Sequence, residues 1–200
     1  SGQFSRILTT DVTIAADQFV HFGDKADKPA DYIANKEGWD GVLANGDPQY
    51  AMSAQAVDGA IKLTSANANL NTRKEDNGII LYKELEGDFL VQTKVVALDG
   101  QAEHRTPAYN EGGLIVLDDS GNRGQEIIHI GVFPNYNCGN MLTHVRGYSR
   151  PQYPRGNGWN YDPYLQIERT GDIFTIRTSQ DGKSWTDMPG SPINAPQPNG

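Results

Sequence analysis

Short runs of alternating apolar and polar residues, separated by turn signals, recur along most of the chain. The run DFLVQTKVVAL (88–98) shows the pattern, with Phe89, Val91 and Thr93 on one side and Leu90, Gln92 and Lys94 on the other. A period of two is the signature of a β-strand with two unlike faces. Comparable runs lie at 60–65, 78–85, 112–118, 125–133, 140–148, 164–169 and 172–179.

Helix signals are sparse, and the best of them is a short segment at 25–36 that Pro29 could open. Many strands with almost no helix favour a sandwich or a barrel, because little is left to cover a parallel sheet. A chain of 200 residues, 37% of them hydrophobic, suits one domain with a core of its own. The expected core residues are Phe89 or Leu90, Leu114 or Ile115, Ile128, Ile130, Leu165, Ile167, Phe174 and Ile176.

The segment TSQDGKSWTDM (178–188) predicts a hairpin near the end of the chain. Asp181-Gly182 lies between two alternating flanks, and Asp-Gly readily occupies the two central positions of a type I′ turn. Trp185 is expected to pack just beyond this turn.

Three segments together resemble a known family. The hairpin region YLQIERTGDIFTIRTSQDGKSWTDM (164–188), with GDFLVQTKVVA (87–97) and EGGLIVLDD (111–119) before it, is similar to the concanavalin A-like domain of bacterial β-xylosidases and related stand-alone proteins. The resemblance covers roughly 37–190 and implies an all-β fold, a two-sheet antiparallel jelly-roll sandwich forming a single domain over 1–200. It further implies a carbohydrate-binding or glycan-processing accessory module of a bacterial polysaccharide-utilisation system, with an oligo- or polysaccharide and a neighbouring hydrolase as partners.

The proline-rich tail PGSPINAPQPNG (189–200) departs from that family. Proline cannot donate to a strand ladder, so the tail is not expected to form the closing strands, and the domain would then lack its last strands. We expect the exposed edge to stay unpaired or to be filled by residues 7–16.

Charge limits the partners. A net charge of −8 argues against nucleic acid, because a nucleic-acid binder needs a basic surface. No apolar run reaches the length of a membrane span, and the first residues lack the pattern of a signal peptide. The family resemblance nevertheless implies a secreted, periplasmic or cell-surface protein whose signal segment is absent from this chain.

Candidate ligand-binding residues gather in the middle of the chain. Alternation along 125–133 places His129 on one side of its strand, and alternation along 140–148 places Leu142, His144, Arg146 and Tyr148 together on the next. We expect the polar members of this set to form one patch on a face that meets solvent. Two long loops, 101–111 and 148–164, add polar and aromatic side chains, and such loops often carry function. These are Arg105, Tyr109, Glu111 and Trp159. The structural alternative is that they cap an open end of the sandwich.

The activity stays open between binding and catalysis. No Glu-x-Asp-x-x-Glu motif provides an evident carboxylate pair, and Glu84, Glu86 and Asp88 flank a predicted turn. The alternative is a polysaccharide lyase or glycoside hydrolase acting in the concave groove. In a lyase, His129, His144 and Tyr148 would supply the proton chemistry and Arg146 would neutralise a uronate carboxylate.

No cofactor is required by this prediction. Acidic loops nevertheless supply the oxygen ligands that calcium prefers, and related sandwiches hold structural calcium. Asp24 and Asp40 are the candidate calcium ligands.

Overall fold

The computed structural model describes residues 7–9, 19–21, 41–45, 52–57, 60–65, 69–71, 75–96, 112–117, 126–133, 139–144, 152–157 and 160–195. In these ranges every regular element is a strand, which confirms the all-β prediction there. The short helix predicted at 25–36 lies outside them. No helix in the described ranges is long and apolar enough to cross a membrane.

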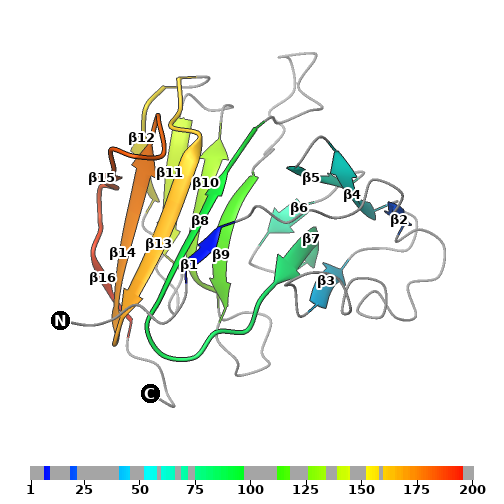
Figure 1. The fold of residues 1–200 in the computed structure, drawn as a ribbon, viewed down its shortest axis with the longest axis horizontal. Coiled ribbons are helices and arrows are strands. Elements are labelled where there is room, and N and C mark those ends of the chain that lie inside the picture. The colour runs from blue at the N-terminus through cyan, green and yellow to red at the C-terminus, as the bar shows by residue number, and fades with distance from the viewer. Residues whose placement is uncertain are drawn as a thin grey trace. The chain divides into compact units, whose positions relative to one another are not determined.

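The chain divides into two compact units (Figure 1). Unit 1 comprises Ser1–Thr10 and Glu86–Gly200, and unit 2 comprises Asp11–Leu85. Unit 2 holds β2 (Phe19–His21), β4 (Met52–Val57) and β5 (Ala60–Ser65) in one sheet, and β3 (Gly41–Asn45), β7 (Glu75–Tyr82) and β6 (Asn69–Asn71) in another. The prediction that 1–200 forms a single domain stays a prediction.

Unit 1 contains two sheets, and β13 and β14 of the first pass in front of β10 and β11 of the second in Figure 1. The first sheet runs β1 (Ile7–Thr9), β8 (Phe89–Lys94), β13 (Tyr164–Thr170), β14 (Ile173–Ser179) and β15 (Thr186–Asp187), with β16 (Ile193–Asn194) also on β14. The second runs β12 (Gln152–Arg155), β11 (Gly139–His144), β10 (Glu126–Phe133) and β9 (Gly112–Leu117). Apart from the parallel β1–β8 pair, neighbouring strands are antiparallel.

The core of unit 1 confirms most of the predicted list. The predicted residues Phe89, Ile128, Ile130, Leu165, Ile167, Phe174 and Ile176 are buried, whereas Leu114 and Ile115 are half-buried. The rings of Phe89 and Phe174 meet edge to face with centroids 6.2 Å apart, a favoured aromatic geometry. Burial of alternate residues on facing positions is the main source of stability in such a layer.

The end of the chain corrects one prediction and agrees with another. The tail was expected to be too rich in proline for a ladder strand, yet Ile193–Asn194 pairs with Phe174 and Ile173 of β14. Pro192 stands before the paired residues and not among them, so the amides of the ladder are intact. The proline content of the tail is therefore no reason to expect missing strands. At the opposite edge, Ile7–Thr9 of the N-terminal segment pairs with β8, which is one of the two outcomes expected for a sheet edge.

The predicted hairpin exists, but its turn is longer than two residues. The β14–β15 ladder closes at Thr178↔Thr186, and Trp185 is half-buried beside it. Asp181 does not sit in a two-residue type I′ turn. Its carboxylate accepts hydrogen bonds from the main-chain N–H groups of Lys183 and Ser184 at 2.8 and 2.7 Å. Hydrogen bonds from nearby main-chain N–H groups to an aspartate side chain stabilise a wider loop than a two-residue turn.

Candidate functional site

The predicted mid-chain patch does not assemble as expected. In the β10–β11 register His129 lies opposite Thr143, and His144 lies opposite Ile128. Directly opposed residues share a face, so positions 129 and 144 belong to alternate faces of this sheet. The expectation that they share one face is therefore wrong.

The burial of Leu142 also contradicts the prediction that its face of the strand meets solvent. Leu142, which was placed on the solvent face, is fully buried opposite the buried Ile130, while Met141 and Thr143 on the other face are also covered. His129 is half-buried. Alternation alone could not show that Leu142 is buried as well as Met141 and Thr143. The other proposed ligand-binding residues, Arg105, Tyr109, Glu111, Arg146, Tyr148 and Trp159, and the calcium candidates Asp24 and Asp40, lie outside the described residues.

The structure instead brings polar residues together on the first sheet of unit 1. The register aligns Gln92, Gln166, Arg177 and Asp187 as one continuous rung across β8, β13, β14 and β15. The core residues Ile167 and Ile176 are their neighbours in sequence and point to the opposite face, because side chains alternate along a strand. The rung therefore lies on the face directed away from the core.

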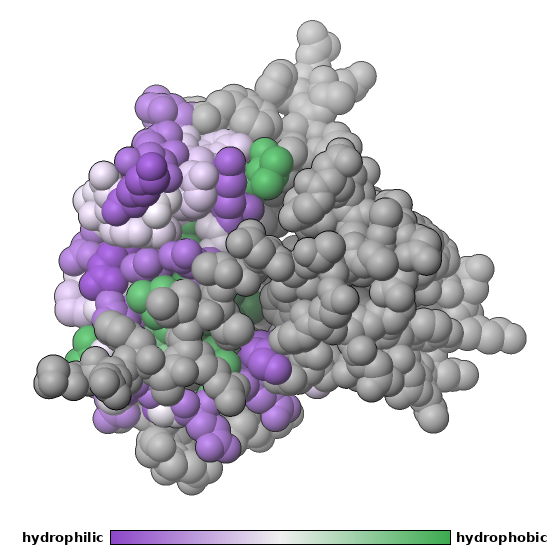
Figure 2. Space-filling view, viewed as in Figure 1, coloured by the Kyte–Doolittle hydropathy of each residue, from purple (hydrophilic) through white to green (hydrophobic). Residues whose placement is uncertain are grey.

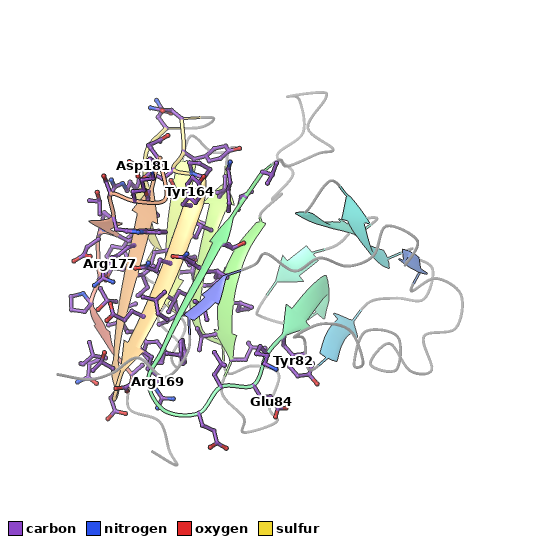
Figure 3. All side chains as sticks on the ribbon, in the orientation of Figure 1. Tyr82, Glu84, Tyr164, Arg169, Arg177 and Asp181 are labelled. Carbon is purple, nitrogen blue, oxygen red and sulfur yellow. The ribbon has the colours of Figure 1, made fainter. Side chains whose placement is uncertain are left out.

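Two further rungs flank this one on the same face. On one side Lys94 pairs with Tyr164, and on the other Glu168 lies opposite Leu90 and Thr175. Figure 3 shows Tyr164 toward one end of the sheet, Arg169 toward the other and Arg177 between them. We name this surface the polar face and define it as Gln92, Lys94, Tyr164, Gln166, Glu168, Arg177 and Asp187. In the same orientation, Figure 2 shows hydrophilic residues over much of the visible side of unit 1.

Arg177 organises the polar face through its guanidinium. Nε donates to Asp187 Oδ1 at 3.1 Å, and Nη1 donates to Gln166 Oε1 at 3.1 Å and to Glu168 Oε2. The planar fork of arginine suits several oriented acceptors at once. Gln166 extends the hydrogen-bond network to β8, since its Nε2 donates to Gln92 Oε1 at 3.4 Å. The side chains thus hold one another in a fixed direction.

The interior of this network is shielded although it lies outside the core. Gln166 is 6% exposed, and the Glu168 and Arg177 side chains are 18% and 26% exposed. Side-chain-to-side-chain hydrogen bonds form a small share of those in folded proteins, so four strands joined by them are unusual. Such an array offers prearranged donors and acceptors at little further entropic cost.

An aromatic ring ends the polar face. The Lys94 ammonium lies 5.2 Å from the centre of the Tyr164 ring, within the range of a cation–π contact. On the loop side, a Cβ placed on Gly182 would come within 2.9 Å of Tyr164 Cε1, so only glycine lets the loop approach that ring. The ring is therefore held in position from both sides.

Two carboxylates elsewhere in unit 1, those of Asp88 and Asp162, have structural partners. Asp88 was predicted to be a turn residue, and its Oδ1 accepts the main-chain N–H of Gly171 at 2.7 Å. Asp162 accepts hydrogen bonds from Thr178 Oγ1 and Gln180 Nε2, both at 2.6 Å, and lies 3.2 Å from Arg155 Nε. Among the side chains that the structure describes, no group of three or more His, Cys, Asp or Glu could hold a metal ion.

The polar face was missed at the sequence level although its signal is visible. YLQIER and FTIRTS each alternate apolar and polar residues, and Gln166 and Arg177 stand at matching distances from the turn between them. Counting outward from that turn along both strands aligns these two residues. The contribution of Asp187 depends on the length of the following loop, which the Asp-Gly signal predicted incorrectly.

No protein-family model matches the chain, and no curated protein or solved structure matches it significantly.

Proposed function

We propose that this chain is a glycan-binding module whose ligand lies on the polar face. The observation that carries the proposal is the rung Gln92–Gln166–Arg177–Asp187, which fixes amide, guanidinium and carboxylate groups in one row outside the core. Sugar hydroxyls both donate and accept hydrogen bonds, so they match a row of alternating donors and acceptors. Tyr164, whose ring is held by Lys94 and the Gly182 loop, adds a phenol hydroxyl at one end that can donate and accept hydrogen bonds.

The proposed fold is a concanavalin A-like jelly roll. Support comes from the quoted sequence segments, which fall on β8, β9, β13 and β14, and from two sheets that share one buried core in unit 1. A sheet covered by core on one side and lined by polar groups on the other presents an extended surface suited to a chain-like ligand.

Binding without turnover is the function that this arrangement favours. Hydrolysis of a glycosidic bond commonly needs one carboxyl group as proton donor and a second as nucleophile or base. On the polar face Glu168 and Asp187 both accept hydrogen bonds from Arg177. Both carboxylates are thereby occupied as partners of one guanidinium, which suits a role in positioning and not in proton transfer.

The proposal includes a location and a partner for the module. A glycan-binding module would act outside the cytoplasm, beside an enzyme that degrades the polysaccharide. Bound calcium at Asp24 and Asp40 is a further proposal at positions beyond the described residues.

Calorimetric titration with a panel of oligosaccharides tests the function. We expect the parent protein to bind at least one of them and Gln92→Ala to weaken that binding by roughly 1–2 kcal/mol, the scale of one lost hydrogen-bonding group. Asn160→Ala is the matched control, because it removes an exposed amide from a residue that belongs to no strand of this sheet. Equal affinities for the parent and Gln92→Ala would rule out this surface as the site.

A further inference from the structure

The guanidinium of the polar face is already paired with two carboxylates. Arg177 donates from Nε and Nη1 to Asp187, Gln166 and Glu168, so a bidentate contact with a further carboxylate, which needs Nε or Nη1 beside Nη2, would have to displace one of these partners. Lys94, the other cation on this face, lies over the Tyr164 ring. Two cations and two carboxylates leave the polar face with no net formal charge.

An anionic ligand would meet repulsion on this surface. A carboxylate that approached Arg177 would also approach Glu168 and Asp187, and Asp187 is the more exposed of the two, with 57% of its side chain accessible. Like charges brought together across an interface cost several kcal/mol. The whole chain adds to this effect, because its net charge is −8.

Neutral hydroxyl groups fit the same atoms. The Gln166 amide donates to Gln92 Oε1, and the Gln92 Nε2 group is a donor on the β8 side of the rung, where Thr9 of β1 is next in the register. Asp187 binds Arg177 through Oδ1, so its other oxygen, Oδ2, is an acceptor at the opposite end. A hydroxyl can accept at the first end and donate at the second, whereas a carboxylate can only accept.

We infer that the polar face selects uncharged sugar units with neighbouring hydroxyl groups over uronate units, because the only guanidinium in its central rung is already clamped between Glu168 and Asp187. This inference rests on the proposed function and gives its ligand a chemical class. A preference for uncharged sugars would also disfavour the lyase alternative, whose substrate is a uronate.

The test compares sugars that differ only at C6. The probes are neutral hexasaccharides of β-1,4-linked glucose, mannose and galactose, each beside the uronate hexamer obtained by oxidising C6, with affinities measured by calorimetry. We expect a neutral hexamer to bind at least about tenfold more tightly than its uronate counterpart, as like-charge contact requires. Added salt should narrow the difference by screening that repulsion and leave neutral binding almost unchanged.

A charge variant tests the assigned cause. Glu168→Gln keeps the shape and removes one of the two carboxylates that hold Arg177, so the preference for the neutral hexamer should fall by roughly tenfold. Glu86→Gln is the matched control, since Glu86 is exposed and lies outside the polar face. It should leave the preference unchanged.

The outcomes separate the two proposals. If a uronate hexamer binds as tightly as its neutral counterpart, or more tightly, the inference about ligand class is wrong while the glycan-binding function stands. If the preference is present but Glu168→Gln and Glu86→Gln leave it equally unchanged, the assigned cause is wrong. If no hexamer of either kind binds, the proposed function fails and the inference fails with it.

Discussion

The side chain of Asn140 and the main chain of Asp162 exchange two hydrogen bonds. Asn140 Nδ2 donates to the carbonyl oxygen of Asp162 at 2.8 Å, and Asn140 Oδ1 accepts the Asp162 N–H at 2.7 Å. The Asp162 carboxylate in turn accepts from Thr178 of the other sheet. Asn140 and Thr178 are both fully buried, so this contact joins β11 to β14 at the end of the core. It also fixes the segment that leads into β13, the central strand of the polar face.

Replacing Asn140 should therefore be costly. Asn140→Ala removes a fully buried side chain and leaves the part-buried N–H and C=O of Asp162 without their partner, so we expect a loss of about 2–4 kcal/mol in the free energy of unfolding. Denaturant titration measures this loss. Asn160→Ala, at an exposed asparagine nearby, is the control and should change stability by less than about 0.5 kcal/mol. Equal stability of the two variants would contradict the role of the Asn140–Asp162 contact.

The loop of the terminal hairpin predicts a dependence on pH. Main-chain N–H groups of Ser184 and Lys183 and the Ser179 hydroxyl donate to Asp181 and hold its pKa well below the ordinary value. Because the folded-state pKa is depressed, ionised Asp181 stabilises the fold above the unfolded pKa of about 4. This contribution is lost as pH falls toward the folded-state pKa.

Asp181→Ala should accordingly lower the melting temperature at neutral pH. The gap between parent and variant should narrow as the pH falls from about 7 to about 3, because the unfolded parent chain then takes up a proton on Asp181 that the folded chain still excludes. Asp181→Asn should lower the melting temperature less, since its amide oxygen can still accept main-chain N–H groups. Thermal unfolding followed by circular dichroism gives all three values. A gap that widens in acid would refute the assignment.

Leu142 tests the corrected orientation of β11. This side chain is fully buried, whereas Val96 is 67% exposed. We expect Leu142→Ala to destabilise the protein by about 2–5 kcal/mol, as truncation in a packed core does. Val96→Ala should cost less than about 0.5 kcal/mol. A mild effect at Leu142 would restore the original expectation that this position faces solvent.

Arg177 should stabilise the polar face through the shape of its guanidinium as well as its charge. Arg177→Met removes the partner of Glu168 and Gln166, and we expect a loss of about 1–2 kcal/mol, reduced at high salt. Arg177→Lys should recover less than half of it, because one ammonium cannot reproduce donors directed from Nε and Nη1. Chemical unfolding at low and high salt measures both variants. Full recovery by lysine would show that charge alone matters.

The sequence predicted strands and their inward residues well, because those depend on alternation within a single run. Phe89, Ile167 and Phe174 lie in runs where apolar residues recur at every second position, and all three are buried. Ile193 was missed because two paired residues after Pro192 are too short to show a period.

The candidate site could not be predicted in the same way. It depends on register, and a shift of one position moves a side chain to the other face. The register sets His144 opposite Ile128 and not opposite His129, which separates the predicted pair. It also aligns Gln166 with Gln92, whose strand β8 is distant in sequence, and with Arg177, whose strand β14 follows β13 after a turn. Composition gave no reason to group these three residues, since none is rare or chemically reactive.

The most direct test of the central claim is a two-dimensional amide NMR titration of the parent protein with the tightest-binding neutral hexasaccharide. If the polar face binds glycan, the largest shift changes should fall on the amides of β8, β13 and β14, at 90–94, 164–168 and 175–179, while those of β9 to β11 move little. The largest changes around His129 on β10, or no changes at saturating sugar, would contradict the claim.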